Sequence, residues 1–402
     1  RHETLRTVFP QRADGTPRQA ALERPVPIDF EDLSLLPEAE RETCLRETAQ
    51  AESLRPFDLC EGPLLRVRLI RLGEEQHVLL LTLHHIVSDG WSMQVMVEEL
   101  VQLYAGYSQG LDVVLPALPI QYADYALWQR SWMEAGEKER QLAYWTGLLG
   151  GEQPVLELPF DRPRPVRQSH RGAQFILELD IDLSQALRRV AQQEGATAFA
   201  LLLASFQALL YRYSGQADIR VGVPIANRNR VETERLIGFF VNTQVLKADI
   251  DGQMGFDRLL HQVRQRSLEA QAHQDLPFEQ LVEALQPERS LSHSPLFQVL
   301  FNYQAERGEH GLPEVAGLSI EEQAWESHTA QFDLVLDTCE SESDIWAALV
   351  YATDLFDAST AERLVRHWQN LLDAILAMPD ARLGELDMLD REEREVIGQL
   401  WN

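Results

Sequence analysis

Two adjacent histidines and an aspartate are the residues of this chain whose types and spacing could do chemistry. They lie in the stretch H-H-I-V-S-D-G-W-S, where His84 and His85 end an apolar run and Asp89 follows four residues after the second histidine. An imidazole has an unperturbed pKa near ~6.5, so His85 could accept a proton from an attacking amine or hydroxyl near neutral pH. A turn through Gly90 into a helix would also place amide donors where an oxyanion develops. This combination indicates acyl transfer.

Other interpretations of the same residues stay open at this point. A zinc site is disfavoured, because adjacent side chains on a strand point to opposite faces and no other histidines have the H-E-x-x-H spacing. By the same geometry we expect His84 to pack and hydrogen-bond. A capped helix start with a satisfied core histidine, and with Ser88 or Asp89 as the cap, would explain the same letters. The sequence has no G-x-S-x-G motif, which favours direct transfer over a covalent acyl-enzyme.

A strand and a helix must position this turn. The run 77–86 is short and apolar and is bounded by turn-forming residues, so it predicts a buried strand. From residue 93 onward the apolar residues recur at helical spacing, which predicts a helix. A buried carboxylate at Asp89 that paired with an arginine would lock the turn and hold His85 at the mouth of a channel.

The rest of the chain predicts a second α/β half. The proline-rich segment 150–170 lacks a sustained period, so it is either the connector between two lobes or a long surface loop within one lobe. Further elements are predicted as strands at 172–179, 218–224, 296–303 and 345–351 and as helices from 184, over 199–210 and over 359–376. We therefore divide the chain into a first lobe at 1–160, a second lobe at 161–385 and a charged tether toward another domain at 386–402.

Composition narrows the function classes. With 36 basic and 63 acidic residues the formal net charge is -27, so the overall field repels nucleic acid and anionic membranes. The cysteines Cys44, Cys60 and Cys339 are few and widely spaced, which argues against a disulfide framework or a thiolate zinc site and favours a reducing compartment. The apolar stretch 199–210 is shorter than the ~18 residues that a membrane span needs. We expect a cytoplasmic protein with no nucleic-acid or membrane partner.

Several motifs, taken in order, resemble one known family. The chain closely resembles the condensation domains of nonribosomal peptide synthetases, which belong to the chloramphenicol-acetyltransferase-like superfamily. Segments similar to the family's second to seventh signatures follow one another at 1–9 (R-H-E-T-L-R-T-V-F), 84–92, 122–128 (Y-A-D-Y-A-L-W), 237–243 (I-G-F-F-V-N-T), 273–279 (H-Q-D-L-P-F-E) and 288–296 (E-R-S-L-S-H-S-P-L). The first signature, of the S-x-A-Q-x-R type, would precede Arg1, so we expect the opening of the first lobe to be missing from this chain.

The resemblance implies a fold and a reaction. The fold would be an α/β sandwich of two acetyltransferase-like lobes that form a V with a central tunnel, and the H-H-x-x-x-D-G turn would lie at its middle. The amine of an acceptor aminoacyl thioester would attack a donor acyl or peptidyl thioester. Both substrates would arrive on the 4'-phosphopantetheine arms of upstream donor and downstream acceptor carrier domains, next to an adenylation domain. The domain itself would bind no cofactor and no metal.

The resemblance also implies a catalytic set made of His84, His85, Asp89 and Gly90. His85 would be the base or the group that orients the amine, and Asp89 would be a structural carboxylate. Gly90 would keep the turn open to the thioester. By the strand geometry, His84 would serve packing and hydrogen bonding more than chemistry.

Three residues outside the motif complete the expected site. Arg1 or Arg6 would be the ion-pair partner of Asp89 and would belong to the substrate site. Asn242 would line the tunnel as a polar residue, and an equal alternative is that it satisfies backbone groups at the end of a strand. We expect Tyr122, like the other large apolar residues of the motifs, to be a core residue.

Two other functions remain as alternatives. An epimerisation domain shares the histidine motif but would invert a carrier-bound residue, and a non-catalytic scaffold would only dock carrier or adenylation domains. The W-S after Gly90 and the segment I-G-F-F-V-N-T are more similar to condensation domains, and to the subtype with an L-configured donor. A heterocyclising relative would carry aspartates in place of His84 and His85.

Overall fold

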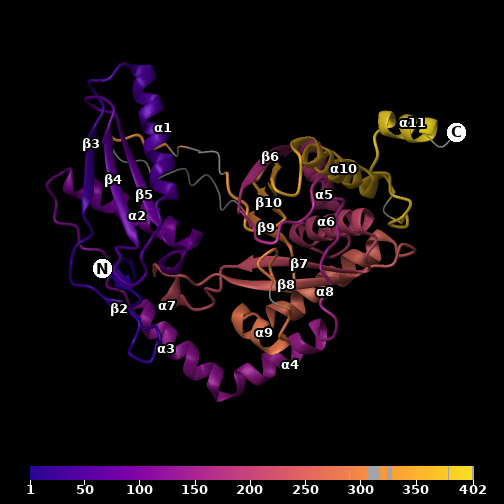
Figure 1. The fold of residues 1–402 in the computed structure, drawn as a ribbon, viewed down its shortest axis with the longest axis horizontal. Coiled ribbons are helices and arrows are strands. Elements are labelled where there is room, and N and C mark those ends of the chain that lie inside the picture. The colour runs from indigo at the N-terminus through magenta and orange to yellow at the C-terminus, as the bar shows by residue number, and fades with distance from the viewer. Residues whose placement is uncertain (289, 306–316, 322, 324–327, 379, 401–402) are drawn as a thin grey trace. The chain divides into compact units, whose positions relative to one another are not determined.

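The computed structural model describes residues 1–402 except 289, 306–316, 322, 324–327, 379 and 401–402 (Figure 1). The chain forms two compact units, and each is considered by itself. The first consists of Arg1–Ala135, Ala226–Val241 and Leu312–Ile320, and the second of Gly136–Ile225, Asn242–Gly311 and Glu321–Asn402. The chain therefore changes unit several times, whereas the sequence predicted a single lobe boundary at residue 160.

The segment 136–160 lies in the second unit because its apolar side chains are buried in the core of that unit. Trp145, Leu149 and Leu158 belong to the same buried cluster as Leu201. Trp145 Nε1 also donates a hydrogen bond to the backbone oxygen of His273 at 2.8 Å. These contacts move the first boundary from 160 to the junction of Ala135 and Gly136.

The first unit combines two small sheets with helices. One sheet pairs β1 and β2 antiparallel, and the other has the order β3–β4–β5, with β3 parallel to β4 and β4 antiparallel to β5. Its elements in chain order are η1 (Glu3–Arg6), β1 (Thr7–Val8), β2 (Ala20–Ala21), β3 (Ile28–Asp32), α1 (Glu38–Leu54), β4 (Leu65–Arg71), β5 (His77–Leu83), η2 (His85–Val87), α2 (Gly90–Tyr107), α3 (Tyr122–Trp132) and α7 (Val231–Glu234). The predicted strand and helix on either side of the histidine motif are thus β5 and α2.

The second unit is built on a larger sheet with the order β6–β11–β10–β9–β7–β8 (Figure 1). Strands β7, β9 and β10 run parallel, and the other neighbours pair antiparallel. Its elements are α4 (Lys138–Leu149), β6 (Gly172–Leu179), α5 (Ile181–Gln193), α6 (Ala198–Ser214), β7 (Asp218–Ile225), β8 (Asn242–Asp249), α8 (Phe256–Gln271), α9 (Phe278–Leu285), β9 (Val299–Ala305), β10 (Leu334–Glu340), β11 (Ile345–Ala352), α10 (Ala358–Ala377) and α11 (Arg391–Leu400). Both units mix helices and strands, which confirms the predicted α/β fold class.

Helix α6 is the central helix of the second unit. Every residue from 200 to 210 is buried, so the apolar run that predicted a core helix forms one. Among the described residues, no single helix is long and apolar enough to cross a membrane. Helices α5 and α6 are long and apolar enough for a membrane span only when they are counted together, and the chain bends by 102° at the break between them.

Strand β9 begins three residues later than the sequence predicted. Leu296 has φ of 68°, in the left-handed region that an extended strand cannot accommodate. The chain therefore turns at the start of the apolar run 296–303 and becomes extended only at Val299.

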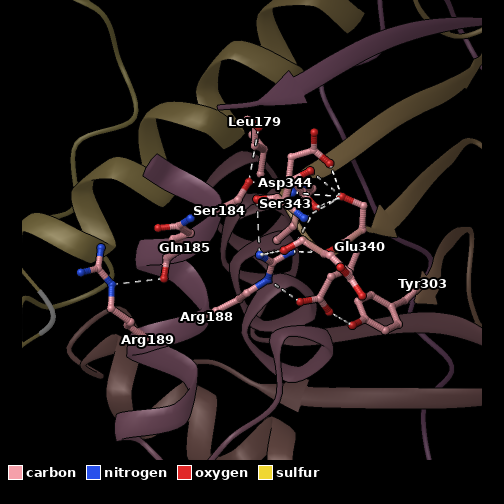
Figure 2. A network of polar contacts seen from close by, with 12 residues as sticks. Leu179, Ser184, Gln185, Arg188, Arg189, Tyr303, Glu340, Ser343 and Asp344 are labelled. Atoms are coloured by element: carbon pink, nitrogen blue, oxygen red, sulfur yellow. Dashed lines mark hydrogen bonds and ion pairs between the residues drawn. The ribbon is translucent and has the colours of Figure 1, made fainter. Parts of the chain in front are cut away.

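An arginine on α5 fixes the hairpin between β10 and β11 (Figure 2). Arg188 Nε lies 2.7 Å from Glu340 Oε1, and Nη2 donates to the backbone oxygens of Ser341 at 2.6 Å and Asp344 at 3.1 Å. The hydroxyl of Tyr303 on β9 donates to the other carboxylate oxygen of Glu340. Burial and this carboxylate raise the pKa of Tyr303. One guanidinium thus neutralises the carboxylate and satisfies the hairpin carbonyls.

Replacing Arg188→Ala should lower the free energy of unfolding by about 2 kcal/mol, because Glu340 and the hairpin carbonyls lose a charged donor. The neighbouring Arg189→Ala is a matched control, since Arg189 is exposed and donates to the backbone oxygen of Gln185 on its own helix at 3.3 Å. Its effect should stay within about 0.5 kcal/mol. Urea unfolding of both variants measures the difference, and equal midpoints would contradict the role of Arg188.

Candidate active site

The histidine motif forms a turn of 3-10 helix between β5 and α2. Strand β5 ends at Leu83, and η2 begins at His85. The backbone N–H of Ile86 donates to His84 Nδ1 at 3.0 Å, so the His84 side chain caps η2. The expectation that both histidines alternate along a strand is therefore wrong, because the strand ends before either of them.

His84 is half-buried and engaged by its surroundings. Its ring meets the ring of Phe57 edge-on, with centroids 5.6 Å apart and an interplanar angle of 89°. Burial, and to a smaller extent the charge of His85, lowers the pKa of His84 below its usual value. Because Nδ1 accepts from Ile86, the proton of the neutral ring resides on Nε2. These contacts agree with the packing and hydrogen-bonding role expected for His84.

His85 differs from His84 in that its side chain is exposed. Its ring contacts the ring of Phe239, with centroids 5.0 Å apart and an interplanar angle of 75°. Within the described part of the chain, neither ring nitrogen of His85 has a hydrogen-bond partner. Both nitrogens are therefore available to a ligand, as a general base or an amine-orienting group requires.

Asp89 is completely buried, and each of its carboxylate oxygens accepts hydrogen bonds. Oδ1 accepts from the backbone N–H of Ser92 at 2.8 Å, which makes Asp89 the N-cap of α2. Oδ2 accepts from the backbone N–H of Phe240 at 2.9 Å. Oδ1 also lies 3.0 Å from Arg228 Nη2, and the two side chains are 0% and 1% exposed. The turn is thus closed by a buried ion pair.

The arginine in this pair is Arg228, and the expectation that it would be Arg1 or Arg6 is wrong. Arg1 Nε lies 3.0 Å from Glu99 Oε1 instead. Arg6 donates from Nη1 to a backbone carbonyl at 2.7 Å. The sequence could not single out Arg228, because 139 positions separate it from Asp89.

Arg228 organises the chain that follows β7. Its Nη1 donates to the backbone oxygens of Thr233 at 2.6 Å and Leu236 at 2.8 Å. The Phe240 ring packs against the guanidinium, with its centroid 4.1 Å from Cζ, which is a cation–π contact. Burial lowers the pKa of Arg228 from its usual value, and Asp89 opposes that shift. A guanidinium nevertheless stays protonated, so the pair is ionic.

Ser92 connects the ion pair to the glycine at 238. Its hydroxyl oxygen accepts from Arg228 Nη2 at 2.7 Å and from the backbone N–H of Gly238 at 3.0 Å. The single hydroxyl proton can go to Asp89 Oδ1 at 2.7 Å or to the Gly238 oxygen at 2.9 Å. Sequence reasoning missed Ser92, although its place one turn after the cap was an available signal.

The segment 237–240 is also held by Tyr122 on α3. The Tyr122 hydroxyl donates to the backbone oxygen of Phe239 at 2.7 Å. A Cβ added to Gly238 would lie 2.3 Å from the Tyr122 ring, so this position accommodates only glycine. Tyr122 packs in a cluster with Phe240, as expected for a core residue, and its hydroxyl in addition fixes the backbone beside His85.

The start of the chain holds the same segment from another side. The backbone N–H of Ile237 donates to His2 Nδ1 at 3.4 Å, and His2 Nε2 donates to Glu99 Oε2 at 2.8 Å. Burial lowers the pKa of His2, although Glu99 opposes the shift. Arg1 also pairs with Glu99, so it supports the site indirectly and does not contact Asp89.

Gly90, the first residue of α2, is exposed and adjoins open space. A Cβ at this position would find no atom within 4 Å. Its φ is not positive, so the backbone does not require a glycine there. Neither packing nor backbone conformation therefore requires glycine at this position.

Asn242 lies in the second unit, at the start of β8. Its Nδ2 donates to the backbone oxygens of Gln274 at 3.0 Å and Leu276 at 2.7 Å. Its Oδ1 accepts from the backbone N–H of Phe278 at 3.0 Å. Because both amide protons are used, these contacts support the alternative that Asn242 satisfies backbone groups rather than binding substrate.

The described residues contain no group of three or more His, Cys, Asp or Glu side chains placed to hold a metal ion. The site consists of an exposed imidazole, a capped turn and a buried ion pair. Sequence reasoning missed Arg228 and Phe239, because nothing in their local spacing connects them to the histidine motif, and it also missed Ser92, which lies within that motif.

Comparison with protein families gives a match over almost the whole chain. The model for the family described as Condensation domain matches residues 1–397. One component of the linear gramicidin synthase of Brevibacillus parabrevis is 46% identical over 100% of this chain, which spans 5% of that protein. A second component of the same synthase is also 46% identical over 100% of the chain, which spans 8% of it. The chain is therefore similar to a small part of much longer proteins.

Solved structures show the same architecture. The X-domain from teicoplanin biosynthesis is 30% identical with a TM-score of 0.87, covering 97% of this chain and 87% of that chain. A four-domain nonribosomal peptide synthetase bound to AMP and glycine is 25% identical with a TM-score of 0.82, covering 98% of this chain and 30% of that one.

Replacing Asp89→Ala should lower the free energy of unfolding by roughly 3 to 5 kcal/mol, because Arg228 would stay buried without its counter-charge. Asp29→Ala is the matched control, since Asp29 is 63% exposed and lies 4.0 Å from Arg68. Pairs of that kind contribute about 1 kcal/mol or less. Urea unfolding with tryptophan fluorescence checks this, and an unchanged midpoint for Asp89→Ala would refute the structural role of the ion pair.

Proposed function

The chain belongs to the condensation-domain family, and from this premise we propose that it joins two thioester-bound substrates through a peptide bond in nonribosomal peptide synthesis. The observation that carries the proposal is the exposed ring of His85, whose nitrogens have no hydrogen-bond partner among the described residues, on a turn held by the buried Asp89–Arg228 pair. The names of the relatives, synthase components of which this chain spans a small part, support a role as one domain of an assembly line.

The proposed step forms one C–N bond and breaks one C–S bond. The nitrogen of the acceptor amine attacks the carbonyl carbon of the donor thioester, and the resulting tetrahedral intermediate expels the donor thiolate. His85 takes the proton that leaves the amine and can return it to the departing thiolate, which regenerates the neutral imidazole. An α-amino group has a pKa of about 7.7 to 8.0, so much of the amine can be neutral without help. His85 can therefore act as much by orienting the amine as by accepting its proton.

We infer that the substrates are delivered by partner domains. An upstream donor carrier and a downstream acceptor carrier would each present a thioester on a 4'-phosphopantetheine arm, so that group belongs to the partners. The four-domain synthetase with AMP and glycine supports a multidomain setting. The segment 386–402, which contains α11, would lead toward an adenylation domain. Carrier-bound thioesters would meet at His85.

An L-configured donor is the finer form of this proposal. The residues W-S after Gly90 and the segment I-G-F-F-V-N-T support it by their similarity to that subtype. An epimerisation domain is the nearest alternative, and it would invert a carrier-bound residue without joining two substrates. Carrier domains loaded with L- or D-configured donors distinguish these outcomes by the product formed.

A docking scaffold is the alternative from another class. The X-domain of teicoplanin biosynthesis, to which this chain is similar, has been solved in complex with OxyB. That complex supports the view that this fold can serve as a docking partner. The intact turn and the available imidazole of His85 favour catalysis for this chain.

His85→Ala should reduce peptide formation by about 100-fold or more, because the amine loses its base or orienting group. The assay uses the complete synthetase module with loaded upstream and downstream carriers and detects the peptide by mass spectrometry. His77→Ala is the control, since His77 is an exposed histidine at the start of β5. Turnover of His85→Ala close to wild type would refute the proposed role of His85 as a base or amine-orienting group.

Gly90→Ala should keep the unfolding midpoint of the wild type, because the new methyl group meets no atom and the backbone is unstrained. Alanine is in fact the better helix former by up to about 1 kcal/mol. Peptide formation should fall by about tenfold or more, since the methyl group would misplace a thioester that approaches the turn. Full activity of this variant would show that the substrate does not pass over Gly90.

A further inference from the structure

The exposed ring of His85 contacts an aromatic residue, Phe239, whose role the sequence motifs do not explain. We propose that Phe239 is the positioning residue of His85, an inference that rests on the proposed function. The centroids of the two rings lie 5.0 Å apart, with an interplanar angle of 75°. This is the edge-on geometry that aromatic pairs prefer. Since the described residues offer the ring of His85 no hydrogen bond, this contact is what restricts its rotation.

A contact of this kind orients an imidazole without using either of its nitrogens. In the usual arrangement of a catalytic histidine, one nitrogen donates to a carboxylate and only the other faces the reaction. At His84 a hydrogen bond already occupies one ring nitrogen, because Nδ1 accepts from the N–H of Ile86. The Phe239 ring leaves both nitrogens of His85 for the amine and for the proton that the amine releases.

Phe239 can position another ring because its own backbone is fixed. Its carbonyl oxygen accepts from the Tyr122 hydroxyl at 2.7 Å. On one side, the N–H of Gly238 is held by Ser92 Oγ at 3.0 Å. On the other side, the N–H of Phe240 is held by Asp89 Oδ2 at 2.9 Å. Three consecutive residues are therefore tied to side chains of the first unit.

The same carboxylate sets the position of both rings. Asp89, which is four residues after His85, caps α2 through the N–H of Ser92, and its Oδ2 accepts from the N–H of Phe240, one residue after Phe239. Backbone near each of the two rings is thus hydrogen-bonded to one buried carboxylate.

The two adjacent phenylalanines differ in their surroundings. Phe240 is buried at 2% exposure among Tyr122, Tyr125 and the Arg228 guanidinium. Phe239 is only partly buried, and His85 is the ring that it contacts. Packing of the core thus accounts for Phe240, whereas Phe239 serves the exposed histidine.

The test replaces the ring and keeps apolar volume. In the complete module with loaded carriers, Phe239→Leu should lower kcat for peptide formation by about 10- to 100-fold, with KM for the acceptor carrier within about twofold. Phe239→Tyr keeps the ring and should restore kcat to within about twofold of wild type. All variants should share the unfolding midpoint of the wild type within about 2 °C, since Phe239 is only partly buried.

The chain offers a matched control in Phe57, whose ring meets His84 edge-on at 5.6 Å. Phe57→Leu removes the same type of contact from the neighbouring histidine and should leave kcat within about twofold of wild type. Equal losses in Phe57→Leu and Phe239→Leu would indicate general loosening of the turn and would overturn the proposal.

His85→Ala, measured alongside, distinguishes failure of the proposed function from failure of positioning by Phe239. If His85→Ala is inactive and Phe239→Leu keeps the wild-type kcat, positioning by Phe239 is refuted and the proposed function stands. If His85→Ala keeps its activity, the proposed function fails and the role of Phe239 fails with it. Loss in both variants, with rescue by Phe239→Tyr, supports the proposal.

Discussion

The buried ion pair of Asp89 and Arg228 is the interaction on which the site depends. Removing two charges from water is costly, and the cost is offset only where geometry is good and the remaining donors and acceptors are satisfied. Both oxygens of Asp89 are bonded, and Arg228 donates to two backbone carbonyls besides, whereas its buried Nε has no hydrogen-bond partner among the described residues. The pair therefore joins the histidine turn, the start of α2 and the segment after β7 into one rigid network of contacts.

That rigidity allows neighbouring residues to take opposite roles. His84 is half-buried and bonded while His85 is exposed and available. Asp89 is buried as a cap while Gly90 adjoins open space. In each pair, one residue anchors the backbone and the next is presented to whatever approaches. A turn that exposes a reactive ring needs such an anchor, because a mobile imidazole is seldom in the productive orientation.

In the second unit, too, polar side chains provide hydrogen-bond partners for backbone groups and for a carboxylate. Arg188 satisfies the carbonyls of a hairpin and the carboxylate of Glu340 (Figure 2). Both polar atoms of the Asn242 side-chain amide form hydrogen bonds with backbone groups around Leu276. Polar residues that look like ligand-binding groups in a sequence are thus often required by backbone groups that would otherwise be buried without partners. Their role is to hold the scaffold in shape.

The sequence by itself determined the local features of this protein. The apolar run of β5, the helical spacing of α2 and the capping aspartate are visible within one stretch, because strand and helix periods and caps are short-range properties. The order of the motifs indicated the family, and the spacing singled out His85.

The tertiary structure decided the partner of Asp89, the place where the chain changes unit, the use of Asn242 and the contact of Phe239 with His85. Those outcomes depend on pairing between residues far apart in the chain, and 139 positions separate Asp89 from Arg228. Local spacing carries no information about which of 36 basic residues will be buried beside a given carboxylate. Only the folded chain brings the two charges together.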